Sequence, residues 1–191
     1  RGFVKADLRL INNNPRLGLA ALKRVAGYGD KYVGSGDVAF SLCPRINATG
    51  RIDNAMKAAS LLLCDDRDDA RFMAEQLDVN NNHRRKLEER IEADVKAQLE
   101  SRPELFGGRI IVVAGKGYHQ GVVGIVASGI TEQYGKPAIV LDIDEEGNAR
   151  GSARSIEGFN IYDAIASCAD LLDHFGGHTK AAGMSHSGDK I

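Results

Sequence analysis

One segment joins an apolar run, a glycine-rich turn and a second apolar run: Arg109-Ile110-Ile111-Val112-Val113-Ala114-Gly115-Lys116-Gly117-Tyr118-His119-Gln120-Gly121-Val122-Val123-Gly124-Ile125-Val126-Ala127. This order predicts a strand, a tight turn and a helix rich in small residues. Glycines at such a junction let backbone N–H groups converge on a negative group at the start of the helix, where the helix dipole also favours negative charge. We therefore expect the turn to bind a phosphate.

Strand and helix patterns alternate after this segment. The predicted elements are a strand at 109–114, a helix at about 120–134, strands at 137–142 and 148–155, a helix at 160–173, a glycine turn and a last segment at 181–184. The pattern predicts an α/β fold with a mixed β-sheet flanked by helices.

The part of the chain before this module is helical in pattern. Short helices are predicted at 17–27 and 53–64, the second with Asp53 as its N-cap. A long helix is predicted from about 68 to 101, because apolar residues recur at four-residue spacing: Leu87, Ile91, Val95 and Leu99. Arg102-Pro103 ends this helix. We place the domain boundary there, with a helical connector closing 1–102 and the α/β domain at 103–191.

The composition restricts the class of protein. The chain has 191 residues, 43% apolar and 27% charged, and a formal net charge of −1, so any nucleic-acid contact must come from a local cationic cluster. Cys43, Cys64 and Cys168 form no CxxC pair, which argues for buried thiols in a reducing compartment. No apolar run approaches the length of a membrane span, and the first residues show no signal-peptide pattern. We expect a cytoplasmic protein without a membrane partner.

The clearest candidate site is the predicted strand at 148–155. Its side chains alternate between two faces, so Arg150, Ser152 and Arg154 share one of them. Two guanidinium groups beside a hydroxyl can clamp a phosphate, because the planar fork binds two phosphate oxygens at once. The alternative is a solvent-exposed edge strand that carries arginines for solubility.

Two histidines lie in glycine-rich surroundings. Gly176, Gly177 and His178 come before a run of small residues that leaves room for another backbone, and this histidine could donate to a phosphate or stack on a base. The two glycines could instead only cap the preceding helix. His119 has no acidic partner at triad spacing, so a phosphate or nucleoside contact is its more economical role. The glycines around it do not have the spacing of a dinucleotide-binding turn.

Acidic clusters at 65–69 and 142–148 are explained without a metal. The first lies where the long helix begins, and the second joins two predicted strands as a solvated turn. Neither supplies a set of carboxylate and histidine ligands.

Four blocks, taken in order, resemble the RecJ family of single-stranded-DNA-specific 5′→3′ exonucleases, within the DHH phosphoesterase superfamily. They are Pro44-Arg45-Ile46-Asn47-Ala48-Thr49-Gly50-Arg51, Tyr118-His119-Gln120-Gly121-Val122-Val123-Gly124-Ile125-Val126-Ala127, Gly151-Ser152-Ala153-Arg154-Ser155, and Phe175-Gly176-Gly177-His178 with Ala181-Ala182-Gly183. The match covers nearly the whole chain. It departs from the family at Gly129, where an arginine is common.

The resemblance implies which part of the enzyme this is. In the family, Mn²⁺ or Mg²⁺ is held by aspartates and histidines of a domain that includes an Asp-His-His motif, and this sequence has no such motif. We therefore expect a C-terminal fragment: the end of the catalytic domain and a helical connector at 1–102, then a truncated DHH-associated substrate-binding domain at 103–191. No metal ligand, bound cofactor or catalytic residue is expected in it, and alone it should be inactive.

The resemblance also implies roles for individual residues. Ser152 and Arg154 should bind the 5′ phosphate, Arg45 and Arg51 should line the nucleotide path, and His178 should contact the substrate near the metals. The expected partner is single-stranded DNA during DNA repair and recombination, with repair proteins unspecified. Two alternatives stay open: a non-catalytic nucleic-acid or tRNA-binding DHH-associated module, and an oligonucleotide or cyclic-dinucleotide phosphodiesterase.

Overall fold

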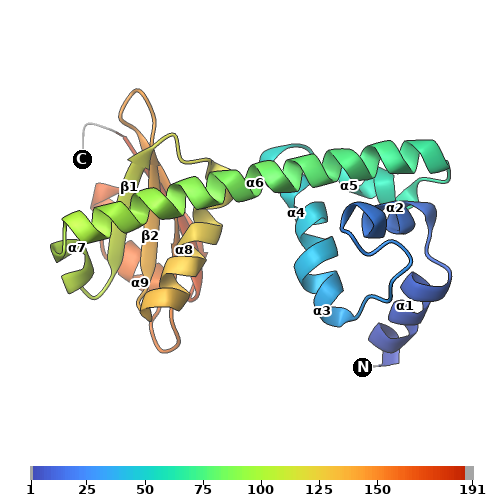
Figure 1. Cartoon of the computed structure of the whole chain (residues 1–191). Coiled ribbons are helices and arrows are strands. Elements are labelled where there is room, and N and C mark those ends of the chain that lie inside the picture. The colour runs from blue at the N-terminus through green and yellow to red at the C-terminus, as the bar shows by residue number, and fades with distance from the viewer. Residues whose placement is uncertain (1, 188–191) are drawn as a thin grey trace. The chain divides into compact units, whose positions relative to one another are not determined.

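The computed structural model describes residues 2–187 (Figure 1). The chain forms two compact units, residues 1–85 and 86–191, and each is described by itself. The division falls within the longest helix, α6 (Arg67–Ser101), which has nearly the bounds predicted from the sequence. The domain boundary predicted after Arg102 stays a prediction. None of the helices described is both long and apolar enough to cross a membrane.

The first unit consists of helices packed around a small apolar core. Its elements are α1 (Gly2–Asn13), α2 (Leu17–Val25), α3 (Ser35–Asp37), the π-helical segment η1 (Val38–Leu42), α4 (Cys43–Ile52), α5 (Met56–Leu63) and the first part of α6. Leu22, Leu61 and Leu77 are buried in the core. A β-carbon at Gly18 would lie 1.8 Å from the carbonyl oxygen of Leu61, so this glycine allows α2 and α5 to approach closely.

The predicted N-cap at Asp53 is wrong. Helix α4 continues through Ile52, so Asp53 follows that helix and pairs with Lys57 at 2.6 Å. Helix α5 begins later, and the side-chain oxygen of Asn54 accepts a hydrogen bond from the Met56 N–H at 2.9 Å. The neighbouring amide therefore satisfies a donor that Asp53 was expected to satisfy.

The second unit contains a five-stranded mixed sheet. The strands are β1 (Ile111–Lys116), β2 (Ala138–Ile143), β3 (Ala149–Arg154), β4 (His174–His178) and β5 (Ala181–His186), in the order β1-β2-β3-β5-β4. Strands β1 and β2 are parallel, and the other neighbours are antiparallel. The helical elements are the second part of α6, α7 (Glu104–Gly107), α8 (Gln120–Tyr134), α9 (Ile161–Ala166) and the 3₁₀ segment η2 (Ala169–Leu171). The predicted mixed α/β fold is confirmed.

Helices cover the two faces of this sheet unequally. Helix α8 packs on β2 and β3, and α9 packs on β4 and β5 (Figure 1). Under α9, Ala153, Ile161, Ile165 and Ala182 form a buried cluster. Since α8 does not share this cluster, it covers the opposite face, and it covers that face only over part of the strands.

Two predictions near the C-terminus need correction. The helix predicted at 160–173 ends at Ala166 and is followed by the short 3₁₀ segment. The predicted glycine turn is instead the edge strand β4, so Gly176 and Gly177 do not cap a helix. Strand pairing with β5 overrides the low strand propensity of glycine here. Cys168 is exposed, and Cys43 and Cys64 are only half-buried, so the three free thiols are not the buried ones expected.

Candidate nucleic-acid interface

Ser152 and Arg154 point from β3 toward α8. A β-carbon at Gly124 of α8 would lie 3.1 Å from Ser152 Oγ and 2.6 Å from Arg154 Nη2, so both side chains occupy the space beside this glycine. The intervening Ala153 is buried in the cluster under α9. The side-chain alternation predicted from the sequence therefore holds, and Gly124 provides the room for the guanidinium group.

The two polar groups are already in contact with each other. Arg154 Nη1 donates to Ser152 Oγ at 2.6 Å and to the carbonyl oxygen of Ala153 at 2.8 Å. These bonds hold the guanidinium group beside the hydroxyl group. An anion that reaches one of them is therefore within reach of the other, which is the requirement for a two-residue phosphate contact.

Strand register extends this face to the edge of the sheet. Ser152 is opposite Gly183, which is opposite Gly176, and Arg154 is opposite Ala181, which is opposite His178. Partners in register point to the same face. Phe175, Ala182 and Met184, which alternate with these residues, pack in the cluster under α9. Ser152, Arg154, Gly176 and His178 therefore share the face that carries α8.

Over β4 and β5, this face of the sheet is exposed and lined by small residues. Gly176, His178 and Gly183 are exposed, and a β-carbon at Gly176 would meet nothing within 4 Å. Two strand spacings, about 10 Å in all, separate the backbone of Arg154 from that of His178. We name this surface the open face and define it by Ser152, Arg154, Gly176, Gly183 and His178.

His178 and Gly177 are shaped by the hairpin between β4 and β5. Nδ1 of His178 accepts a hydrogen bond from the Lys180 N–H at 3.3 Å, which leaves Nε2 as a donor when the ring is neutral. Gly177 has φ +153°, and a β-carbon there would lie 2.4 Å from the carbonyl oxygen of Ala181. Gly177 is thus required by the backbone, whereas Gly176 leaves the open face uncovered.

His119 has a different environment. It is the N-cap of α8, and its Nδ1 accepts from the Gly121 N–H at 3.1 Å. The Tyr118 N–H donates to Asp142 Oδ1 at 2.8 Å. Two N–H groups of the glycine turn are therefore satisfied within the protein, and the phosphate expected at this turn stays a prediction. The hydrogen bond found for the His119 ring joins it to Gly121, two residues further along the same turn.

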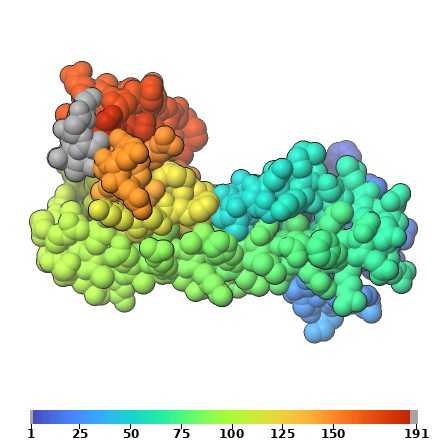
Figure 2. Space-filling model, turned by 90° about the horizontal axis from the view of Figure 1, so that it is seen from above, coloured from blue at the N-terminus to red at the C-terminus, as the bar shows by residue number. Residues whose placement is uncertain are grey.

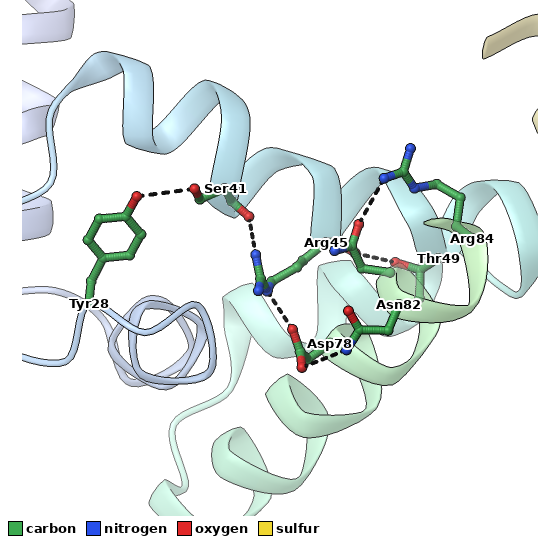
Figure 3. A network of polar contacts seen from close by, with 8 residues as sticks. Tyr28, Ser41, Arg45, Thr49, Asp78, Asn82 and Arg84 are labelled. Carbon is green, nitrogen blue, oxygen red and sulfur yellow. Dashed lines mark hydrogen bonds and ion pairs between the residues drawn. The ribbon is translucent and has the colours of Figure 1, made fainter. Parts of the chain in front are cut away.

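Arg45 and Arg51 lie in the first unit, so they are not placed beside the open face. Arg45 Nε donates to Asp78 Oδ1 at 2.7 Å, and Arg45 Nη1 donates to the carbonyl oxygen of Ser41 at 2.7 Å (Figure 3). Only 17% of the Arg45 side chain is exposed. These contacts tie α4 to α6 and to η1. Arg51 is exposed at the end of α4 and has a partner of its own.

Sequence reasoning missed the residues that hold the turn before α8. Tyr118 is buried, its hydroxyl group donates to Asp94 Oδ2 of α6, and Gln98 Nε2 donates to the same hydroxyl oxygen at 3.2 Å. Burial, followed by the hydrogen bond to Asp94 and the negative charge of that carboxylate, raises the pKa of Tyr118 well above its usual range. Asp142, expected in a solvated turn, is half-buried at the end of β2. Because Asp94 and Asp142 each lie 24 residues from Tyr118 in the chain, no local sequence pattern indicated these contacts.

The charged groups of the open face suit an anion. Within residues 2–187, no three His, Cys, Asp or Glu side chains gather closely enough to hold a metal ion. The open face instead offers a guanidinium group, a hydroxyl group and an imidazole ring, which bind phosphate oxygens.

Comparisons with known proteins agree on one family. The DHHA1 domain model matches residues 107–191. The single-stranded-DNA-specific exonuclease RecJ of Bacillus subtilis is 40% identical over 100% of this chain and 24% of its own length. That of Escherichia coli K12 is 37% identical over 92% of this chain and 32% of its own length. The chain thus spans between about a quarter and a third of these curated relatives.

Solved structures give the same result. RecJ from Thermus thermophilus in complex with Mg²⁺ matches with a TM-score of 0.80 and 35% identity, over 96% of this chain and 28% of that one. A structure described as exonuclease RecJ bound to manganese matches with a TM-score of 0.80 and 35% identity, over 98% of this chain and 45% of that one.

Proposed function

The chain belongs to the RecJ family, and from this premise we propose that it is the part of a single-stranded-DNA exonuclease that grips the 5′ end of the strand. The whole enzyme would hydrolyse phosphodiester bonds in DNA repair and recombination, with Mg²⁺ or Mn²⁺ as cofactor. We assign to this chain the binding of the strand, and to the rest of the enzyme the hydrolytic step. Alone it binds the strand without cutting it.

One observation carries this proposal: Ser152, Arg154 and His178 share the open face, with glycines between them. A terminal phosphate carries more negative charge than an internal one, and a guanidinium group beside a hydroxyl group can bind several of its oxygens. His178, across the glycine floor, can donate from Nε2 to the same nucleotide or stack on its base. Gly176 and Gly183 let the sugar and phosphate approach the sheet.

The direct test is binding of a 5′-phosphorylated single-stranded oligonucleotide by the whole chain, measured by fluorescence anisotropy. Affinity should fall with salt, because bound cations release counterions. Arg154→Ala should weaken binding roughly tenfold to a hundredfold, as expected for a charge-assisted hydrogen bond. Arg109→Ala is the matched control, since it removes an exposed arginine of the same unit outside the open face. Equal affinities of the two variants, or binding that ignores salt, would contradict the proposal.

The two alternative functions left open by the sequence predict different ligands that compete with the oligonucleotide for binding. A phosphodiesterase for short substrates should release the oligonucleotide when a dinucleotide or cyclic dinucleotide is added at matched nucleotide concentration. A tRNA-binding module should prefer folded RNA to single-stranded DNA. The proposal predicts that neither competitor matches the single strand.

A further inference from the structure

A second group of cations flanks the turn between β1 and α8. A β-carbon at Gly117, which has φ +71°, would lie 3.7 Å from Arg90 Nη2 of α6. Lys116 comes directly before this glycine and is exposed. Lys86 precedes Arg90 by four residues, so the two side chains lie on the same side of the helix. The outer surface of α6 is the green band in Figure 2.

The turn is fixed to the helix that carries Arg90. The Tyr118 hydroxyl group bonds to Asp94, one turn after Arg90, and Gln98 Nε2 donates both to this hydroxyl oxygen and, at 2.9 Å, to the carbonyl oxygen of Ala114. A β-carbon at Gly115 would lie 2.2 Å from the Tyr118 ring, so the backbone and the ring are in close contact. The helix backbone that carries Arg90 therefore keeps a fixed position relative to the turn.

Arg90 has no ion-pair partner within the described part of the chain, and its side chain is exposed. The nearest acid of the same helix flank, Asp94, is bonded to Tyr118. The charges of Glu88 and Glu89 raise the pKa of Glu92, which lies on the side of α6 that faces Gly129. Lys86 and Arg90 therefore lie on a different side of α6 from the acidic group around Glu92, with the Asp94 carboxylate one turn beyond Arg90.

We propose that Lys86, Arg90 and Lys116 form a second contact for nucleic acid, a track that binds the phosphodiester backbone of the strand beyond its terminal phosphate. The inference rests on the proposed function, because it takes the same strand as ligand. Exposed lysine and arginine side chains at a fixed turn suit internucleotide phosphates, which carry one charge each and no sequence information. The open face holds the end of the strand, and the track holds its continuation.

The test compares two ligands, a 5′-phosphorylated mononucleotide and a 5′-phosphorylated oligothymidylate, over a range of salt concentrations. Arg90→Ala should leave mononucleotide binding unchanged. It should weaken oligothymidylate binding and reduce the slope of log affinity against log salt by about 0.7, the value for one phosphate contact on a single strand. Arg90→Lys should keep most of the binding. Lys96→Ala is the matched control, since Lys96 is an exposed cation of the same helix paired with Glu100.

The outcomes separate this inference from the function on which it rests. If Arg154→Ala weakens both ligands while Arg90→Ala behaves like Lys96→Ala, the track is overturned and the open face stands. If Arg90→Ala also weakens mononucleotide binding to the same degree, Arg90 belongs to the terminal site and the track is again overturned. If the unmodified chain binds neither ligand, both proposals fail.

Discussion

Gly176 and Gly177 are neighbours on β4 with different surroundings. A β-carbon at Gly176 meets nothing within 4 Å, whereas one at Gly177 lies 2.4 Å from the carbonyl oxygen of Ala181 and 2.5 Å from Ala182 Cα. Gly177 also has φ +153°, which other residues rarely adopt. Only Gly177 is therefore needed for the backbone, and the absence of a side chain at Gly176 leaves room for a ligand on the open face.

Gly176→Leu should separate binding from folding. The new side chain extends over the open face, so it should abolish binding of a 5′-phosphorylated strand while changing the free energy of unfolding by less than about 0.5 kcal/mol. Gly177→Ala should instead cost about 1–3 kcal/mol, because it adds strain and a backbone clash. Urea unfolding and anisotropy on both variants check this. A well-folded Gly176→Leu variant that still binds would show that the strand lies elsewhere.

Tyr118→Phe tests the bond between the turn and α6. Loss of the hydroxyl group leaves the Asp94 carboxylate and the Gln98 amide without this partner, so the free energy of unfolding should fall by about 1–3 kcal/mol. Tyr134→Phe is the control, because within residues 2–187 the Tyr134 ring packs on Phe106 and no hydrogen bond of its hydroxyl group is found. Equal urea midpoints for the two variants would rule out a stabilising role for the Tyr118 hydroxyl group.

For individual residues, the sequence predicts the position of a side chain where that position follows from local backbone geometry. The two-residue period of a strand places Ser152 and Arg154 together, and the structure agrees. The sequence does not reveal that His119 caps the helix it precedes, or that Arg45 is paired with Asp78, 33 residues away. Those contacts depend on which polar group is nearest in space, and spacing along the chain does not record that.

Two of the three glycines in helix α8, Gly124 and Gly129, should respond in opposite ways to replacement by alanine. At Gly129 a β-carbon would lie 3.7 Å from Glu92 Oε1, an ordinary contact, so Gly129→Ala should stabilise the helix by about 1 kcal/mol. At Gly124 a β-carbon would displace Arg154, so Gly124→Ala should weaken binding of the 5′-phosphorylated strand. Thermal unfolding and anisotropy measure the two effects. A Gly129→Ala variant that is less stable than the original would contradict this view of the helix.

The segment of α6 around Glu92 predicts a pH dependence. Partial burial, then the charges of Glu88 and Glu89, raise the pKa of Glu92 above its usual 4.5. The folded state therefore binds this proton more tightly than the unfolded state, and the ionised carboxylate lowers stability once the pH rises through the raised pKa. Glu92→Gln should be more stable than the original chain at neutral pH, and the difference should vanish below pH 4.5. A difference that stays constant with pH would assign the effect to packing.

Elements with a strong repeating pattern were predictable, and elements that depend on pairing were not. Helix α8 has the predicted bounds, 120–134, because apolar and small residues repeat along it. Strand β4, His174–His178, has two glycines and no apolar alternation, so it was expected as a turn. It becomes a strand because β5 offers a complete ladder of partners, a tertiary effect outside any local window.

For the whole molecule, the family assignment depends on blocks from both units, but the structure supports the interface in the second unit only. Ser152, Arg154 and His178 come together through the strand order β3-β5-β4, which the sequence does not specify. Arg45 and Arg51 belong to the first unit, and their expected place on the nucleotide path stays a proposal.

The central claim is that Arg154 recognises the phosphate at the 5′ end of a strand. The most direct measurement is a double-mutant cycle, in which the original chain and Arg154→Ala each bind the same single strand with a 5′ phosphate or a 5′ hydroxyl. We predict that the original chain prefers the phosphate and that Arg154→Ala loses this preference, with a coupling energy of at least about 1.5 kcal/mol. A coupling energy near zero, with the preference unchanged in the variant, would contradict the account.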